Sequence, residues 1–210
     1  MKGIVFDMDG TLVSSMSYWN KCYEAVVLGR CKVYPDNLVE VLTPMGIKKG
    51  SEYIHNLGHE KSAEEIYEEI QDIMTDNYIN KIPLKPCAME YIKQMKEKGI
   101  KMCILSASTP KMIKACAESK GLMEYLEFAT ACESLNLTKN QPEIFDVIAE
   151  KMGLKTKDLM VIDDSIYVLE AAKKAGAIAC GIYDDEWKDI VEEVKKTADK
   201  YIYSFKELVD

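Results

Sequence analysis

Two pairs of aspartates stand directly after short apolar segments that we expect to be buried strands. Asp7 and Asp9 follow the first such segment, with Gly10 providing a turn, and Asp163 and Asp164 follow a later one. Residues two apart on a strand project to the same side, so Asp7 and Asp9 are expected on one face. Four carboxylates at one sheet edge would repel each other at neutral pH unless a cation neutralised them or some stayed protonated. Because hard oxygen ligands suit Mg²⁺, the pattern predicts a magnesium site.

Further polar residues could hold an anion beside these carboxylates. Ser106 and Ala107 end another apolar segment, where a hydroxyl and free backbone amides at a helix start form a ready anion site. Lys139 precedes a helical segment and adds a positive charge. Each has a simpler interpretation, namely a helix cap for the serine segment and solvated surface for the lysine. The pair Asp163 and Asp164 could likewise be helix-capping residues, since an aspartate near a helix start is favourable by itself.

The elements that must position these residues alternate between apolar strands and helices. Each helical pattern ends at a glycine, as C-terminal caps do. This alternation predicts an α/β fold, a Rossmann-like parallel sheet with helices on both faces. The expected strands are residues 3–6, 101–105, 127–130, 159–162 and 177–182.

One region interrupts the alternation and contains only helical patterns. Within it, Ser62 and Glu65 form a capping box that opens a long helix. The chain has 210 residues, about one and a half typical domains, which fits one domain with an insertion. We therefore expect an all-helical cap at 15–82, inserted into an α/β core formed by 1–14 and 83–210.

Composition narrows the class of protein. The 35 acidic and 27 basic residues give a net charge of −8, which disfavours a general nucleic-acid binder. The seven cysteines are scattered without a C-x-x-C pair, so neither disulfides nor a zinc site is indicated. No apolar run reaches the about 18 residues that a membrane span needs. We expect a soluble cytoplasmic protein, a monomer or weak dimer, with no nucleic-acid or membrane partner.

The order of these motifs resembles the haloacid dehalogenase-like (HAD) hydrolase superfamily over nearly the whole chain. The motifs are D-x-D-G-T at 7–11, S-A-S at 106–108, a lysine before P-E-I-F at 139–145, and D-D-S at 163–165. The cap position is similar to that of the phosphatases and β-phosphoglucomutase-like enzymes. The third motif commonly reads K-P-x-P and here reads K-N-Q-P, which predicts the same charge in a less rigid loop.

The resemblance implies roles for the four aspartates. Asp7 would be the nucleophile that forms an aspartyl-phosphate, and Asp9 would act as general acid and then as general base. The cofactor would be Mg²⁺, held by Asp7, the backbone carbonyl of Asp9, and Asp164. Asp163 would act on the ion through a water molecule.

The resemblance also implies a phosphate site and a reaction. Ser106 and nearby amides, including that of Ala107, would bind the phosphoryl oxygens, and Lys139 would neutralise charge in the transition state. The expected function is Mg²⁺-dependent hydrolysis of a small phosphorylated metabolite, a phosphomonoester.

A basic loop in the cap offers an alternative chemistry. The segment 43–49 carries Gly46, Lys48 and Lys49, and in related enzymes a loop at this place contacts the substrate. It is also similar to the segment of phosphonoacetaldehyde hydrolases in which a lysine forms a Schiff base, at the position of Lys49. Those enzymes replace the second aspartate of the first motif, whereas Asp9 is present here. We therefore expect substrate contact from these residues.

Two further alternatives stay open at this point. A β-phosphoglucomutase-like phosphotransferase would use the same aspartates while excluding water, and no motif separates it from a phosphatase. A non-catalytic phospho-accepting module also combines carboxylates, a hydroxyl and a lysine, but is about half this length. Trp19, on the first expected cap helix, is a further candidate for contact with the substrate.

Overall fold

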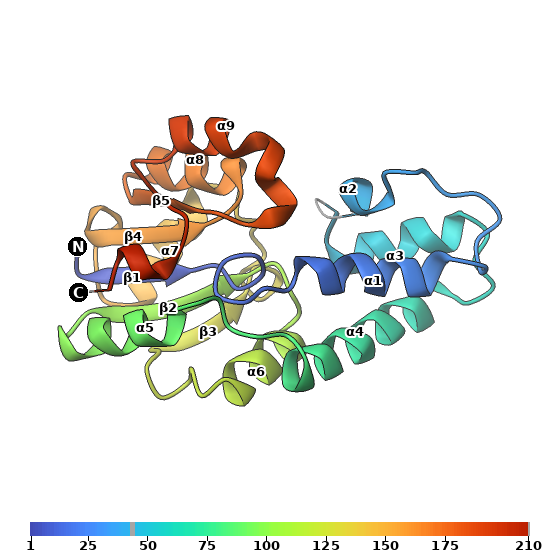
Figure 1. Cartoon of the computed structure of the whole chain (residues 1–210), viewed down its shortest axis with the longest axis horizontal. Coiled ribbons are helices and arrows are strands. Elements are labelled where there is room, and N and C mark those ends of the chain that lie inside the picture. Colours follow the sequence, from blue (N-terminus) through green and yellow to red (C-terminus); the bar gives the residue numbers. More distant parts are fainter. Residues whose placement is uncertain (43–44, 210) are drawn as a thin grey trace.

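The computed structural model describes residues 1–42 and 45–209. Its centre is a sheet of six parallel strands in the order β3-β2-β1-β4-β5-β6 (Figure 1). The strands are β1 (Gly3–Phe6), β2 (Lys101–Ser106), β3 (Phe128–Ala131), β4 (Leu159–Asp163), β5 (Ile178–Ile182) and β6 (Lys200–Ile202). The five predicted strands are confirmed to within a residue or two at each end. The edge strand β6 was not predicted, because it has only three residues, of which one is buried, and carries too little apolar signal.

The sheet is covered on both faces by helices. Ile4 and Phe6 of β1 belong to one apolar cluster with α5 and α6, whereas Val5 points into a second cluster with α7 and α8. Alternation along the strand therefore supplies a core to each face, and the predicted α/β fold class is confirmed. The covering helices are α5 (Ala88–Glu97), α6 (Pro110–Ser119), α7 (Glu143–Lys151), α8 (Ile166–Ala175) and α9 (Val191–Thr197). Short 3-10 helices are η2 (Glu133–Leu135), η3 (Thr156–Asp158), η4 (Asp185–Ile190) and η5 (Phe205–Glu207).

A group of helices lies between β1 and α5 in the chain and stands beside the sheet (Figure 1). Two segments of the chain, one entering and one leaving this group, lie side by side and connect it to the sheet. Ser14 N–H donates to the Pro83 carbonyl at 3.1 Å, and Val13 forms an antiparallel bridge with Leu84. The division of the chain at 15 and 82 stays a prediction. The helices of this group are α1 (Met16–Val27), α2 (Leu38–Leu42), α3 (Gly46–Asn56) and α4 (Ala63–Asn80).

The helix α4 is the longest of this group and forms as the sequence predicts. Ser62 Oγ accepts from Glu65 N–H at 3.3 Å, and Ser62 N–H donates to Glu65 Oε2 at 2.9 Å, which completes the capping box. Its buried stripe runs through Ile66 and Ile70 and ends at Tyr78, close to the sheet. Among the described helices, none combines the length and the apolar character that crossing a membrane requires.

The predicted basic loop at 43–49 is a helix from Gly46 onward, and residues 43 and 44 lie outside the described residues. Ile47 and Ile54 are buried on one face of α3, because apolar residues at helical spacing favour a helix wherever a core can cover them. Lys48 and Lys49 are on the exposed face.

Candidate active site

A buried lysine bridges two aspartates at the carboxyl edge of the sheet. Asp7 follows β1, and Asp163 ends β4, the strand that pairs with β1 in register. Lys139 Nζ donates to Asp7 Oδ1 and, at 2.9 Å, to Asp163 Oδ2. All three side chains are no more than 8% exposed. Asp163 Oδ1 accepts from the Ser165 N–H at 2.9 Å, so both of its oxygens are held. The structure thus brings together three residues spread over the whole chain.

Asp164 completes a cluster of three carboxylates. One oxygen from each of Asp7, Asp163 and Asp164 lies within 4.8 Å of the others, and all three residues are buried. The backbone of Gly10 passes beside them: a Cβ added there would lie 2.4 Å from Asp164 Oδ2, and its φ of +76° is one that glycine adopts readily. Hard oxygen donors gathered at this spacing fit a divalent cation such as Mg²⁺. The cluster could therefore hold a metal.

The pKa values of the cluster are shifted by burial and by the charges that lie close together. Burial, opposed by Lys139 and reinforced by Asp163, raises the pKa of Asp7 from 3.8 to about 7. Burial and the neighbouring carboxylates raise the pKa of Asp164 well above its usual value. Burial would lower the pKa of Lys139, but Asp163 and Asp7 raise it well above 10.5, so the lysine stays charged. One cation does not balance three buried carboxylates, which favours binding of a second.

Asp9 is hydrogen-bonded to the helical insertion and to the loop that follows β2. Its Oδ1 accepts from Trp19 Nε1 at 3.1 Å and from the Tyr78 hydroxyl, and its Oδ2 accepts from Ser108 Oγ at 2.8 Å. Asp7 and Asp9 thus have different hydrogen-bond partners, and the expectation that they share one face stays a prediction. The strand β1 ends at Phe6, so strand alternation does not by itself place Asp9.

The predicted phosphate-binding residues lie at the end of β2. Ser106 is its last residue and is buried, with its Oγ accepting from the Ser108 N–H at 3.0 Å, while Ala107 is exposed in the loop that follows. This hydrogen bond gives the turn before α6 a defined shape. Thr109 caps α6 and also donates to Gln71 Oε1 at 2.9 Å, which ties the loop to α4.

The loop that carries Lys139 has its own internal bonds. Gln141 Oε1 accepts from the Thr138 N–H at 2.8 Å and from Thr138 Oγ1 at 3.0 Å. The glutamine, at the position before Pro142, therefore closes a turn around Lys139. These bonds restrain the loop where the usual proline is missing, and its lower rigidity stays a prediction.

Of the residues in the helical insertion that were predicted to contact the substrate, one contacts a carboxylate of the site and, within the described part of the chain, three do not. Trp19 contacts Asp9 and so belongs to the site. Gly46 begins α3, and Lys48 and Lys49 are exposed on it; within residues 1–42 and 45–209, the contacts found at the carboxylates involve none of these three. Their predicted contact with the substrate stays a prediction.

Three residues at the site were not predicted from the sequence. Tyr78 and Ser108 contact Asp9, and Trp187 Nε1 donates to Asp164 Oδ2 at 2.8 Å. Tyr78 carried a signal, since a tyrosine that ends a buried apolar stripe brings a hydroxyl that needs a partner. Trp187 lies in the short helix η4, whose backbone is non-helical at this residue, and no periodic pattern there indicates a contact.

The molecule is thus an α/β protein with a helical insertion after the first strand and a buried cluster of carboxylates and a lysine at the carboxyl edge of its parallel sheet. Residues 1–176 match the family model described as haloacid dehalogenase-like hydrolase, and the chain belongs to this family. The predicted superfamily and enzyme class are thus confirmed.

Relatives agree with this assignment, and a solved structure shares the fold. The chain is 25% identical to a phosphoglycolate phosphatase of Aquifex aeolicus, over 84% of this chain and 82% of that one. It is 22% identical to a phosphorylated carbohydrates phosphatase of Thermotoga maritima, again over 84% and 82%. The crystal structure of CbbY from Rhodobacter sphaeroides in complex with phosphate superposes with a TM-score of 0.82, covering 99% of this chain and 96% of that one at 22% identity. That last likeness concerns the fold.

Proposed function

We propose that this protein is a Mg²⁺-dependent phosphatase that hydrolyses a small phosphomonoester through an aspartyl-phosphate on Asp7. The observation that carries the proposal is the buried Lys139 held between Asp7 and Asp163, with Asp164 beside them. A nucleophilic carboxylate with a fixed ammonium against it can accept a phosphoryl group, because the lysine offsets the charge brought by the substrate.

The first step transfers the phosphoryl group to the enzyme. An oxygen of Asp7 attacks phosphorus in line, the ester P–O bond breaks, and the leaving oxygen takes a proton from Asp9. Asp7, Asp164 and the backbone carbonyl of Asp9 would hold Mg²⁺, with Asp163 acting through water. When bound, the ion supplies positive charge that offsets the carboxylates and the phosphoryl oxygens.

The second step releases phosphate. Asp9 takes a proton from the attacking water, the new P–O bond forms, and Asp7 is freed as a carboxylate. The three donors to Asp9, namely Trp19, Tyr78 and Ser108, fix where its carboxylate lies during both steps. Ser106 and the amides of the following loop would bind the phosphoryl oxygens.

The substrate class follows from the relatives named above, which act on phosphorylated carbohydrates and on phosphoglycolate. We infer that this enzyme also takes a small phosphorylated metabolite. A Schiff-base mechanism has less support, because Lys49 is exposed on α3 and Asp9 is present and engaged.

The test is hydrolysis of p-nitrophenyl phosphate with Mg²⁺ and with excess chelator, followed by a panel of sugar phosphates and other small phosphates ranked by kcat/KM. We expect turnover that requires Mg²⁺ and that disappears in Asp7→Asn. Turnover that resists chelation or survives this substitution would refute the mechanism. Transfer of phosphate to a second sugar position, without release of phosphate, would favour the mutase.

A further inference from the structure

We propose that Trp187 is a positioning residue for the metal site: its indole N–H holds one oxygen of Asp164 and keeps the other available to Mg²⁺. This inference rests on the proposed function, because it concerns the ion which that function requires. It adds a residue outside the four motifs, on a segment that follows β5.

The geometry around Asp164 shows why one oxygen is committed. Trp187 Nε1 donates to Asp164 Oδ2 at 2.8 Å, and the backbone of Gly10 lies so close to the same oxygen that an added Cβ would be 2.4 Å from it. Oδ2 is thus enclosed between an indole and a backbone turn. A metal ion bound by the undisturbed Asp164 would contact Oδ1.

Repulsion within the cluster explains why Asp164 needs a donor. Its carboxylate lies within 4.8 Å of those of Asp7 and Asp163, and like charges at this distance favour rotation of a side chain away from its neighbours. Lys139 contacts the other two carboxylates, and Asp164 instead receives the indole N–H. The hydrogen bond opposes that rotation before the ion arrives. Partners of this kind orient ligands in many metal sites.

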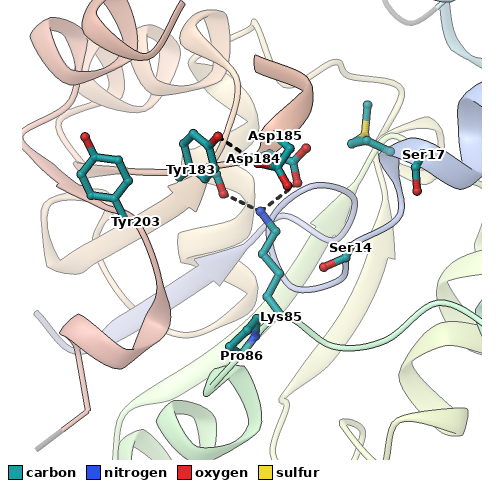
Figure 2. A pocket seen from close by; sticks show the side chains of 9 residues that line it. Ser14, Ser17, Lys85, Pro86, Tyr183, Asp184, Asp185 and Tyr203 are labelled. Atoms are coloured by element: carbon teal, nitrogen blue, oxygen red, sulfur yellow. Dashed lines mark hydrogen bonds and ion pairs between the residues drawn. The ribbon is translucent and has the colours of Figure 1, made fainter. Parts of the chain in front are cut away.

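The segment carrying Trp187 is itself anchored. Lys85 Nζ lies 2.9 Å from Asp184 Oδ2 and donates to the Tyr183 carbonyl at 2.6 Å (Figure 2). The two charged side chains are only about one tenth exposed, and Trp187 N–H donates to the Asp184 carbonyl at 3.1 Å. Lys85 follows the segment that returns from the helical insertion, so a largely covered ion pair connects the segment that carries Trp187 to the core.

The main experiment is calorimetric titration of Mg²⁺ into the wild type, Trp187→Phe and Trp19→Phe. We expect Trp187→Phe to bind Mg²⁺ about 10- to 100-fold more weakly, the range found when such a partner is removed from a metal ligand. Tyr91→Phe, titrated in the same way, is the control, because this buried ring packs on Phe6 and Phe205. It should bind Mg²⁺ as the wild type does. At saturating Mg²⁺, kcat of Trp187→Phe should return to near the wild-type value.

A second measurement leaves position 187 unchanged. The chain has two tryptophans, so Trp187 is the sole tryptophan of the Trp19→Phe variant. Its fluorescence should change as Mg²⁺ is added, with a midpoint equal to the calorimetric dissociation constant.

The outcomes separate this inference from the proposed function. Equal dissociation constants for the wild type and Trp187→Phe, or emission that does not respond to Mg²⁺ in Trp19→Phe, would overturn the role of Trp187 and leave the phosphatase proposal standing. A kcat that stays low at saturating Mg²⁺ in Trp187→Phe, with unchanged affinity, would show a structural role and also overturn it. A wild type that binds no Mg²⁺ would overturn the proposed function, and this inference with it.

Discussion

Replacing Asp7 with asparagine should stabilise the metal-free protein, and the gain should grow as the pH rises. Burial raises the pKa of Asp7 from 3.8 to about 7, so in the folded protein this carboxyl keeps its proton where the unfolded chain has lost it. Its contribution to stability is complete below the unfolded pKa and is lost as the pH rises through the folded pKa. Asparagine stays neutral throughout and suffers no such loss.

The magnitude follows from the size of the pKa shift. At pH 5 the unfolded carboxyl is already ionised, and two further pH units separate this point from the folded pKa of about 7. Each unit changes the free energy of unfolding by about 1.4 kcal/mol. The stability of Asp7→Asn relative to the wild type should therefore rise by about 3 kcal/mol between pH 5 and pH 8.

The assay is urea unfolding of both proteins, followed by circular dichroism at several pH values in excess chelator. Titrating groups remote from Asp7 are present in both proteins, so their contributions cancel in the difference. Repeating the series with Mg²⁺ should remove the advantage of the variant, because the ion stabilises the folded state that binds it better. If the difference in unfolding free energy between the two proteins does not change between pH 5 and pH 8 in chelator, burial does not raise the pKa of Asp7 and the prediction is refuted.

Three further substitutions test other parts of the site. Tyr78→Phe should lower kcat for alkyl phosphates by about 10- to 100-fold and for p-nitrophenyl phosphate much less, because only a poor leaving group needs a proton from a well-placed Asp9. Gly10→Ala should cost about 1–3 kcal/mol of stability in urea unfolding, from its backbone conformation, and should also abolish measurable Mg²⁺ binding because the added Cβ displaces Asp164. Lys139→Met should lower kcat/KM by about 10²- to 10³-fold, since it removes the fixed charge beside the nucleophile.

Each of these has a control within the chain. Tyr91→Phe changes another buried tyrosine, one that packs on Phe6 and Phe205 away from Asp9, and should affect both substrates equally. Equal losses in Tyr78→Phe would contradict its role. Gly99 has a similar φ of +72° with no atom within 4 Å of an added Cβ, so Gly99→Ala should lose stability and keep Mg²⁺ binding. For Lys139→Met, a kcat/KM within a factor of about three of the wild type would contradict the prediction that the positive charge of Lys139 assists catalysis.

Much of the fold could be predicted from local patterns. An apolar run of four or five residues that ends in acidic or turn residues indicates a buried strand and its carboxyl end, whatever the rest of the chain does. This placed Asp7 and Asp163 at one sheet edge. The helical region after β1 was visible for the same reason, because the capping box at Ser62 and the period of α4 are local. The edge strand β6 escaped, since its few residues carry no such pattern.

The site was predicted less completely than the fold. The strand ends that carry Asp7 and Asp163 follow from the sequence. Lys139 by itself indicated solvated surface and was placed at the site only by the family resemblance. The directions of the side chains do not follow from the sequence. Asp9 turns toward Tyr78, 69 residues away, and toward Ser108, 99 residues away, while Asp164 is held by Trp187 from beyond β5.

The sequence by itself therefore determined the α/β sheet, the helical insertion and the acidic residues with their lysine partner. Only the tertiary structure decided that Asp7 and Asp9 face different partners, and that Trp19 and Trp187 each donate to a different carboxylate. The physical reason is the range of the interactions. Strand and helix patterns depend on neighbours within a few residues, whereas a hydrogen bond between distant segments depends on how the whole chain packs.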